Sequence, residues 1–195
     1  MKIKIFLALL FTAIIFSSCK KDDEGDYNFF GDSIEPGKTL IVYFTRTNNT
    51  QQIANHIEAL TGADLYRIEV VNPYPSDYND ATRVAEREKD ENARPQIANL
   101  PENIDEYQTI MIGFPIWWSS RPMVIATFLE SFDFGGKNIV PFCTHGGGGV
   151  GQAFAEISAH TPGSKHLEGF VISGSQAGEA RSQVQSWLNR IFIQN

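Results

Sequence analysis

One stretch near the start of the apolar body decides the fold: TLIVYFTRTNNT, residues 39–50. Its first half, residues 39–44, is a nearly continuous run of apolar and β-branched side chains. Such a run is typical of a strand that is buried on both faces of a parallel sheet. Its second half, residues 45–50, is a polar loop that leads directly into a helix. The stretch therefore predicts a strand, a ligand-binding loop and a helix in immediate succession.

Strand and helix patterns alternate through the rest of the chain. Apolar residues repeat at helical spacing after residue 50, and Gly62 ends that helix. Further strands are predicted at residues 65–71, 109–114, 138–143 and 167–172, and further helices at residues 77–92, 123–130, 150–160 and 180–191. Five strands with helices between them predict an α/β fold, a doubly wound five-stranded parallel sheet. In such sheets ligands bind at the carboxyl ends of the strands, where the strand order reverses.

Composition excludes several classes of protein. The 195 residues, of which 42% are hydrophobic and 20% charged, suit one packed domain rather than a disordered chain. The net charge of −7 argues against a nucleic-acid partner, which would require a basic face. Two Cys and four His argue against a disulfide framework and a metal site.

The first nineteen residues resemble a targeting signal. Lys2 and Lys4 precede an apolar run at residues 5–16, which is shorter than the ~20 residues that a bilayer-spanning helix requires. The sequence Phe16-Ser17-Ser18-Cys19 resembles a bacterial lipobox. That resemblance implies a signal peptide at residues 1–18 and lipidation of Cys19. An ordinary secretory signal is the alternative.

Residues 19–37 show no hydrophobic period and are rich in charge, Gly and Pro, so they are interpreted as a lipid-anchored flexible tether. The run KDDE at residues 21–24 resembles a surface-export signal of some lipoproteins, and a solvated spacer is the other interpretation. We therefore expect a membrane-anchored lipoprotein, periplasmic or at the cell surface. Its only membrane attachment would be the N-terminal lipid, and residues 38–195 would form the domain.

The first polar loop is interpreted as a phosphate site. Hydroxyls, side-chain amides and backbone N–H groups gather there at a helix N-terminus, whose dipole favours anions. The loop lacks the glycines that a Walker A or dinucleotide motif needs, so it suits one terminal phosphate monoester. Asn and Thr are also ordinary helix caps, which leaves that second interpretation open. The candidate residues are Thr45, Arg46, Thr47, Asn48, Asn49 and Thr50.

Two more loops follow the strands at 109–114 and 138–143. The first has two adjacent tryptophans, of which only one can easily turn inward, so the other can form a flat wall for a planar ring. The second has four consecutive glycines, which suit a close approach of backbone N–H groups to a ligand or, alternatively, a mobile turn. The candidate residues are Pro115, Ile116, Trp117, Trp118, Thr144, His145, Gly146, Gly147 and Gly148.

A phosphate cup, an aromatic wall and an amide-lined edge together match flavin mononucleotide, FMN. At this point the chain resembles the flavodoxin family over residues 38–191. The resemblance is carried by TRTNNT at 45–50, PYPSDY at 73–78, PIWW at 115–118 and the Gly-rich loop at 144–151. The PYPSDY segment is interpreted mainly as a rigid lead-in to the helix that follows it.

The resemblance implies roles for individual residues. Phosphate contacts fall on Thr45, Thr47, Asn49 and Thr50, with Arg46 as an additional cation. Many flavodoxins have Gly at the position of Asn48, and Asn tolerates the left-handed backbone conformation better than most residues.

Two positions of the other loops also receive roles. Trp117 falls on the position that stacks on the flavin, and Trp118 falls where many flavodoxins keep Gly. In the family, a left-handed backbone at this position lets a carbonyl accept a hydrogen bond from the reduced flavin, which favours the one-electron form. A Trp disfavours that backbone conformation, so the resemblance predicts two-electron rather than one-electron chemistry. Backbone amides of residues 145–148 would face the pyrimidine edge of the ring.

The leading functional hypothesis is an FMN-binding, flavodoxin-like redox protein that carries out electron transfer at a membrane surface. Its partner, a protein or a small-molecule acceptor, is not specified by the sequence. One alternative is an FMN-dependent NAD(P)H:quinone-type oxidoreductase, and another is a flavodoxin-fold binding module that has lost FMN. No catalytic triad or carboxylate pair is predicted. Cys143 is expected to be a core residue, and His56, His160 and His166 are expected at the surface.

Overall fold

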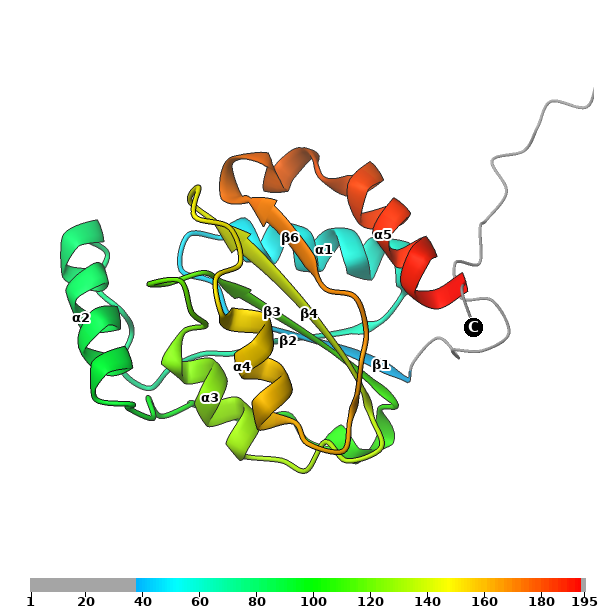
Figure 1. Cartoon of the computed structure of the whole chain (residues 1–195), viewed down its shortest axis with the longest axis horizontal. Helices are drawn as coiled ribbons and strands as arrows, with labels where there is room; N and C mark the ends of the chain where they lie inside the picture. The colour runs from blue at the N-terminus through cyan, green and yellow to red at the C-terminus, as the bar shows by residue number, and fades with distance from the viewer. Residues whose placement is uncertain (1–37, 194–195) are drawn as a thin grey trace, which may run out of the picture.

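The computed structural model describes residues 38–193, which form a parallel sheet covered by helices on both faces (Figure 1). The centre of the sheet consists of β1 (Thr39–Tyr43), β3 (Thr109–Pro115) and β4 (Asn138–His145). All five residues of β1 are buried, as expected for a strand covered on both sides. The edge strand β2 (Asp64–Arg67) pairs with β1, so the order begins β2-β1-β3-β4. The predicted doubly wound fold is confirmed.

The fifth position of the sheet is divided between two short strands. β5 (Lys165–His166) pairs with the start of β4, and β6 (Phe170–Ser173) pairs with its end. The ladder stops between them opposite Pro141: Leu167 N–H still donates to Ile139 O, but Pro141 has no N–H to continue the ladder. The single strand predicted at residues 167–172 is therefore wrong in its bounds, although residues 170–172 do form part of a strand of the sheet.

The second strand is also shorter than predicted. β2 ends at Arg67, and Val70 instead forms an antiparallel bridge to Ile97. The alternating pattern at residues 65–71 thus belongs to two different pairings. As a result, the chain turns away from the sheet edge before it reaches the next helix.

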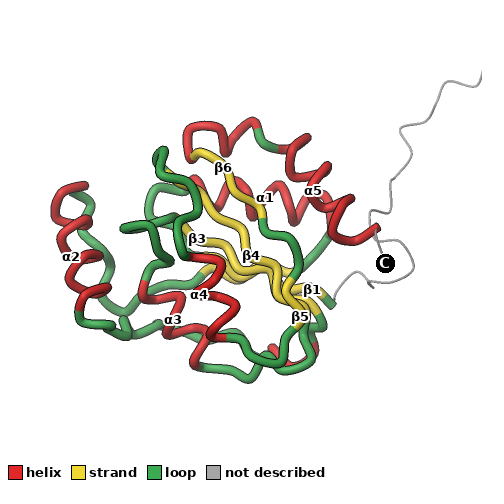
Figure 2. The backbone as a smooth tube through the Cα atoms, in the orientation of Figure 1, coloured by secondary structure: helices red, strands yellow, loops and turns green. Residues whose placement is uncertain are grey.

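Two hydrophobic cores, one on each face of the sheet, hold the helices against it. On one face, α1 (Asn49–Thr61) and α5 (Arg181–Ile193) cover the sheet with fully buried side chains such as Ile53 and Trp187. On the other face, α3 (Met123–Glu130) and α4 (Ala153–His160) contribute Phe128 and Ile157 (Figure 2). Two 3-10 helices complete the fold: η1 (Ile104–Glu106) precedes β3, and η2 (Gly174–Glu179) lies between β6 and α5.

The helix α2 (Tyr78–Asp90) stands away from the sheet, at the left in Figure 1. Only Ala81 and Ala85 of α2 are buried, so it has no large apolar face. Asp77 caps α2 by accepting a hydrogen bond from Asp80 N–H. The helix therefore begins at Tyr78, one residue later than predicted. This placement leaves the inner side of α2 facing the carboxyl ends of the strands.

The signal peptide at residues 1–18, Cys19 and the tether at 19–37 lie outside the described residues. Among residues 38–193, none of the helices has the length and hydropathy needed to cross a bilayer.

Candidate functional site

The carboxyl ends of β1, β3, β4 and β6 surround a cavity of about 620 Å³, within the size range of small-molecule sites. Twelve of the fifteen residues predicted from the sequence line it: Thr45, Arg46, Thr47, Asn49, Thr50, Pro115, Ile116, Trp117, Trp118, Thr144, His145 and Gly146. Among the described residues, Asn48, Gly147 and Gly148 are not part of its lining. The three predicted loops therefore do meet at one site.

The first loop and the N-terminus of α1 form the polar end of the cavity. Thr50 is buried, and its hydroxyl lies 2.9 Å from the Thr144 hydroxyl, which joins the first loop to the glycine-rich loop at the end of β4. Asn48 has φ 64°, so it adopts the left-handed conformation that we expected it to tolerate. Its carbonyl accepts a hydrogen bond from Gln52 N–H, which starts the helix. The first turn of α1 carries no acidic residue, so nothing there opposes the helix dipole's attraction for an anion.

Arg46 is held beside this polar end. Its guanidinium donates to Ser76 O at 3.1 Å and lies 5.9 Å from the centre of the Tyr78 ring. Both partners belong to the PYPSDY segment. The interpretation of this segment as a mere lead-in to the helix is therefore incomplete, because it also orients a cation of the cavity.

Two sets of cavity residues were not predicted from the sequence. One set follows β6, which also ends at this edge of the sheet: Ser173, Gly174 and Ser175. A side chain at Gly174 would place its Cβ 2.5 Å from Asn49 Nδ2, so glycine allows the two loops to approach. The other set is the inner side of α2: Tyr78, Ala81, Thr82 and Ala85. The first set could have been predicted, because ligands bind at the carboxyl ends of parallel strands and these residues follow β6. The second set could not, because no sequence pattern indicates that α2 stands away from the sheet.

The two tryptophans take different positions, as expected for adjacent residues in a turn. Trp117 packs edge-on against Phe44 and Tyr74, with ring centres 5.5 and 4.8 Å apart. Tyr74 in turn donates to Glu88 at 2.8 Å, and burial raises the pKa of both Tyr74 and Glu88. Trp117 is thus fixed by a cluster of rings while it contributes to the cavity wall.

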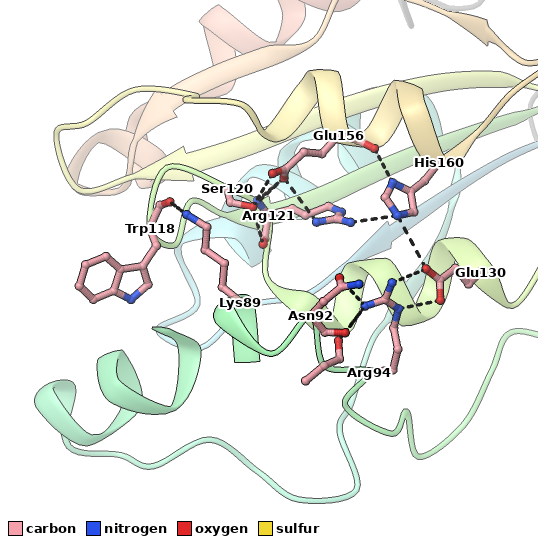
Figure 3. A network of polar contacts seen from close by, with 10 residues as sticks. Lys89, Asn92, Arg94, Trp118, Ser120, Arg121, Glu130, Glu156 and His160 are labelled. Carbon is pink, nitrogen blue, oxygen red and sulfur yellow. Dashed lines mark hydrogen bonds and ion pairs between the residues drawn. The ribbon is translucent and has the colours of Figure 1, made fainter. Parts of the chain in front are cut away.

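Trp118 is 44% exposed and lies over α2 (Figure 3). Its indole N–H donates to Thr82 O at 3.2 Å, and its carbonyl accepts from Lys89 Nζ at 2.7 Å. Trp118 and Ser119 have φ 51° and 58°, so both are left-handed. Each such residue costs on the order of 1–2 kcal/mol when it is not glycine.

Residues 117–120 form a tight turn around this strained pair, which we name the tryptophan turn. Trp117 N–H donates to Ser120 O at 3.0 Å, and Ser120 N–H donates to Trp117 O at 2.9 Å. Two left-handed central residues define the turn type that normally selects Asn and Gly. The surrounding structure must therefore impose this conformation.

Two segments hold the turn from the side of α4. Gln152 N–H donates to Ser119 O at 2.8 Å, and a Cβ at Gly151 would lie only 2.2 Å from that same oxygen. Gly151 also has φ 56°, which favours glycine. The Glu156 carboxylate accepts from the Ser120 hydroxyl at 2.6 Å (Figure 3).

Behind the turn, Arg121 is 6% exposed and connects to a wider polar network (Figure 3). Its backbone N–H donates to Glu156 at 3.2 Å, and its guanidinium lies 3.2 Å from His160 Nε2. Burial lowers the pKa of Arg121, although the Glu156 carboxylate acts in the opposite direction. His160 and His56 are half-buried rather than fully exposed, and His56 Nε2 lies 3.1 Å from Ala177 O, whereas His166 is exposed.

Cys143 takes no part in the cavity lining. It is fully buried in β4, as predicted, and burial raises the pKa of its thiol to about 12. A thiol that remains protonated is a poor nucleophile. Cys143 is therefore a packing residue.

Together, the doubly wound sheet and a cavity with a polar helix N-terminus and an aromatic wall define a nucleotide-binding α/β protein of the flavoprotein type. The flavodoxin family model matches residues 38–191. The chain belongs to the flavodoxin family, whose members bind FMN, so the expected cofactor agrees with the family. No curated protein matches the chain.

Solved structures support this assignment. A protein of Bacteroides uniformis, provisionally described as a flavoprotein, is 32% identical, with a TM-score of 0.71, over 80% of this chain and 99% of its own. A similar protein of Bacteroides eggerthii is 32% identical, with a TM-score of 0.68, over 78% and 96%. A flavoprotein of Lactobacillus acidophilus in complex with FMN is 20% identical, with a TM-score of 0.60, over 73% of this chain and 97% of its own, and it shows the shared fold alone.

The residues present fit FMN. Hydroxyls and the α1 N-terminus can hold a phosphate, with Arg46 as a neighbouring cation. The tryptophan turn and Tyr78 supply aromatic surface for a planar ring. Thr144, His145 and Gly146 add polar groups to the lining. The phosphate and the planar ring of FMN therefore each have a matching set of groups.

Proposed function

We propose that this protein is an FMN-binding redox protein that carries out electron transfer at a membrane surface. The observation that carries the proposal is the convergence of the hydroxyl-rich first loop, the tryptophan turn and the glycine-rich loop at the end of β4 on one cavity. Bound FMN would supply the redox chemistry, while the protein supplies position and electrostatics.

Different residues would bind the phosphate and the flavin ring of FMN. Thr45, Thr47, Asn49 and Thr50 would hold the phosphate at the start of α1. Arg46, oriented by Ser76 and Tyr78, would add a positive charge beside it. Trp117 is braced by neighbouring rings and would offer a rigid surface to the flavin.

The anchor at Cys19 would place this domain at a membrane. The lipobox-like sequence before Cys19 and the polar segment at residues 20–37 support this part of the proposal. Such a tether allows the domain to meet soluble or membrane-bound redox partners while one end stays fixed.

Two measurements on the full-length protein test the proposal. The protein purified from membranes should show flavin absorbance in the visible range, and acid release should yield FMN rather than riboflavin. Replacement Cys19→Ser should move the protein from the membrane fraction to the soluble fraction. A colourless protein that does not bind added FMN would contradict the redox function, and an unchanged membrane location would contradict the anchor.

A second candidate is an FMN-dependent NAD(P)H:quinone-type oxidoreductase. It is favoured by the exposed rings of Tyr78 and Trp118 at the cavity, which offer a place for a second planar molecule. An NADH:FMN oxidoreductase shares the fold at 14% identity, which is compatible with this candidate. Oxidation of NAD(P)H in the presence of a quinone would distinguish this enzyme from a carrier that only exchanges electrons with a protein partner.

A further inference from the structure

The tryptophan turn has an unusual distribution of hydrogen bonds. All four of its carbonyl oxygens are engaged: those of Trp117 and Ser120 with each other's N–H, that of Ser119 with Gln152 N–H, and that of Trp118 with Lys89 Nζ. In contrast, within residues 38–193 the N–H groups of Trp118 and Ser119 have no hydrogen-bond partner. The backbone of the turn therefore has two unengaged N–H donors, whereas each of its carbonyl oxygens already accepts a hydrogen bond.

Within the described part of the chain, Lys89 is the one side chain that donates to a carbonyl of the turn. It comes from the last turn of α2, and its ammonium reaches Trp118 O at 2.7 Å. The Trp118 indole bonds the same helix through Thr82 O. Since α2 buries only Ala81 and Ala85, these two hydrogen bonds are a substantial part of its attachment to the body.

We propose that Lys89 is a positioning residue that sets the hydrogen-bonding character of the cavity wall. By occupying the Trp118 carbonyl, Lys89 keeps the tryptophan turn a donor surface. This inference rests on the proposed binding of FMN.

A donor surface distinguishes the two redox forms of a flavin. The oxidised ring presents nitrogen lone pairs, whereas two-electron reduction to the anionic form adds one proton, which turns one of these nitrogens into an N–H donor. Donors match the first form and leave the second without an acceptor, so the turn should favour oxidised over reduced FMN. Freed from Lys89, the Trp118 carbonyl would become available to accept a hydrogen bond from the reduced ring.

Removal of Lys89 should change the relative affinity for reduced and oxidised FMN in a direction that loss of charge alone cannot produce. Loss of a cation would weaken binding of a reduced, anionic flavin more than that of the oxidised form. Release of the carbonyl would instead favour the reduced form. Removal of Lys89 therefore separates a hydrogen-bonding role from a simple electrostatic one.

The experiment measures the dissociation constants of oxidised FMN and of dithionite-reduced FMN on the full-length protein. The ratio of the reduced to the oxidised constant should fall about tenfold in Lys89→Met, the factor expected for one charge-assisted hydrogen bond. Arg87→Met, which removes the same charge from an exposed position two residues away, should leave the ratio near that of the wild type. Lys89→Arg retains a donor and should stay close to the wild type.

The outcomes are separable. Equal weakening of both forms in Lys89→Met would show a merely structural role and would overturn the proposal, and so would an increase in the ratio. If the wild-type protein bound neither form, the proposed function itself would fail, and this inference with it. Wild-type binding with an unchanged ratio in Lys89→Met would overturn the inference and leave the proposed function intact.

Discussion

The hydroxyls of Thr50 and Thr144 lie 2.9 Å apart and join the loop after β1 to the end of β4. Both residues are buried, and both line the cavity. Thr50 is also in the first turn of α1, so the contact fixes the helix N-terminus relative to the central strands. The polar end of the cavity is therefore set by the packing of the fold rather than by a mobile loop.

Thr50→Val should weaken FMN binding about tenfold and leave riboflavin binding nearly unchanged, because Val keeps the shape and removes the hydroxyl next to the proposed phosphate position. Fluorescence titrations with both ligands check this. Thr61→Val, which removes a buried hydroxyl bonded to Ile57 O at the other end of α1, is the matched control. An equal loss for both ligands would indicate a general disturbance rather than a lost phosphate contact.

Arg46→Met should weaken FMN binding and reduce its dependence on salt, because a half-buried guanidinium beside the phosphate would act mainly through charge. Titrations at low and high ionic strength measure both effects. Arg67→Met, at the end of β2 and outside the cavity lining, serves as the control. If Arg46→Met binds FMN with the same salt dependence as the wild type, Arg46 is not a phosphate cation.

Gly151→Ala should lower the free energy of unfolding by about 2 kcal/mol or more. Its Cβ would lie 2.2 Å from Ser119 O at a backbone φ of 56°, so both steric overlap and left-handed strain contribute. Urea denaturation of the apo protein measures this change. Gly148→Ala in the same loop meets nothing within 4 Å and should be nearly neutral, and equal effects in the two variants would contradict this account.

Cys143 should make stability fall at alkaline pH. Burial raises the pKa of its thiol from 9.0 to about 12, so between these values the unfolded chain loses a proton that the folded chain keeps. The unfolded state then binds fewer protons, and the free energy of unfolding decreases by roughly 1.4 kcal/mol per pH unit.

Denaturation of the wild type and of Cys143→Ala at pH 9 and 10 isolates this contribution. The stability difference between the two proteins should change by roughly the stated slope, while well below pH 9, where the thiol is protonated in both states, it should be constant. A constant difference across the whole range would show that the thiol ionises normally in the folded state.

Much of the site followed from the sequence because one physical rule connects loops that are distant in the chain. Apolar β-branched runs identified β1, β3 and β4, and the carboxyl ends of parallel strands meet at one edge. The loops at residues 45–50 and 115–118 were found in this way. Asn48 was expected to tolerate a left-handed backbone, and it adopts one.

The remainder depended on tertiary contacts that have no local signature. The polar helix α2 was recognised, but nothing in its pattern indicates that Tyr78 and Thr82 face the cavity. The left-handed Trp118 contradicts its local preference and is imposed by Lys89, Gln152 and Glu156 from distant parts of the chain. The split of the fifth strand follows from Pro141 and became evident only with the register of β4.

The most direct test of the central claim is a fluorescence titration of the protein, freed of bound flavin, with FMN and with riboflavin. The hydroxyl-rich loop at the start of α1 predicts that FMN binds at least tenfold more tightly, because only FMN carries the phosphate. Equal affinities for the two ligands, or no binding of FMN at all, would contradict the assignment of this cavity as an FMN phosphate and ring site.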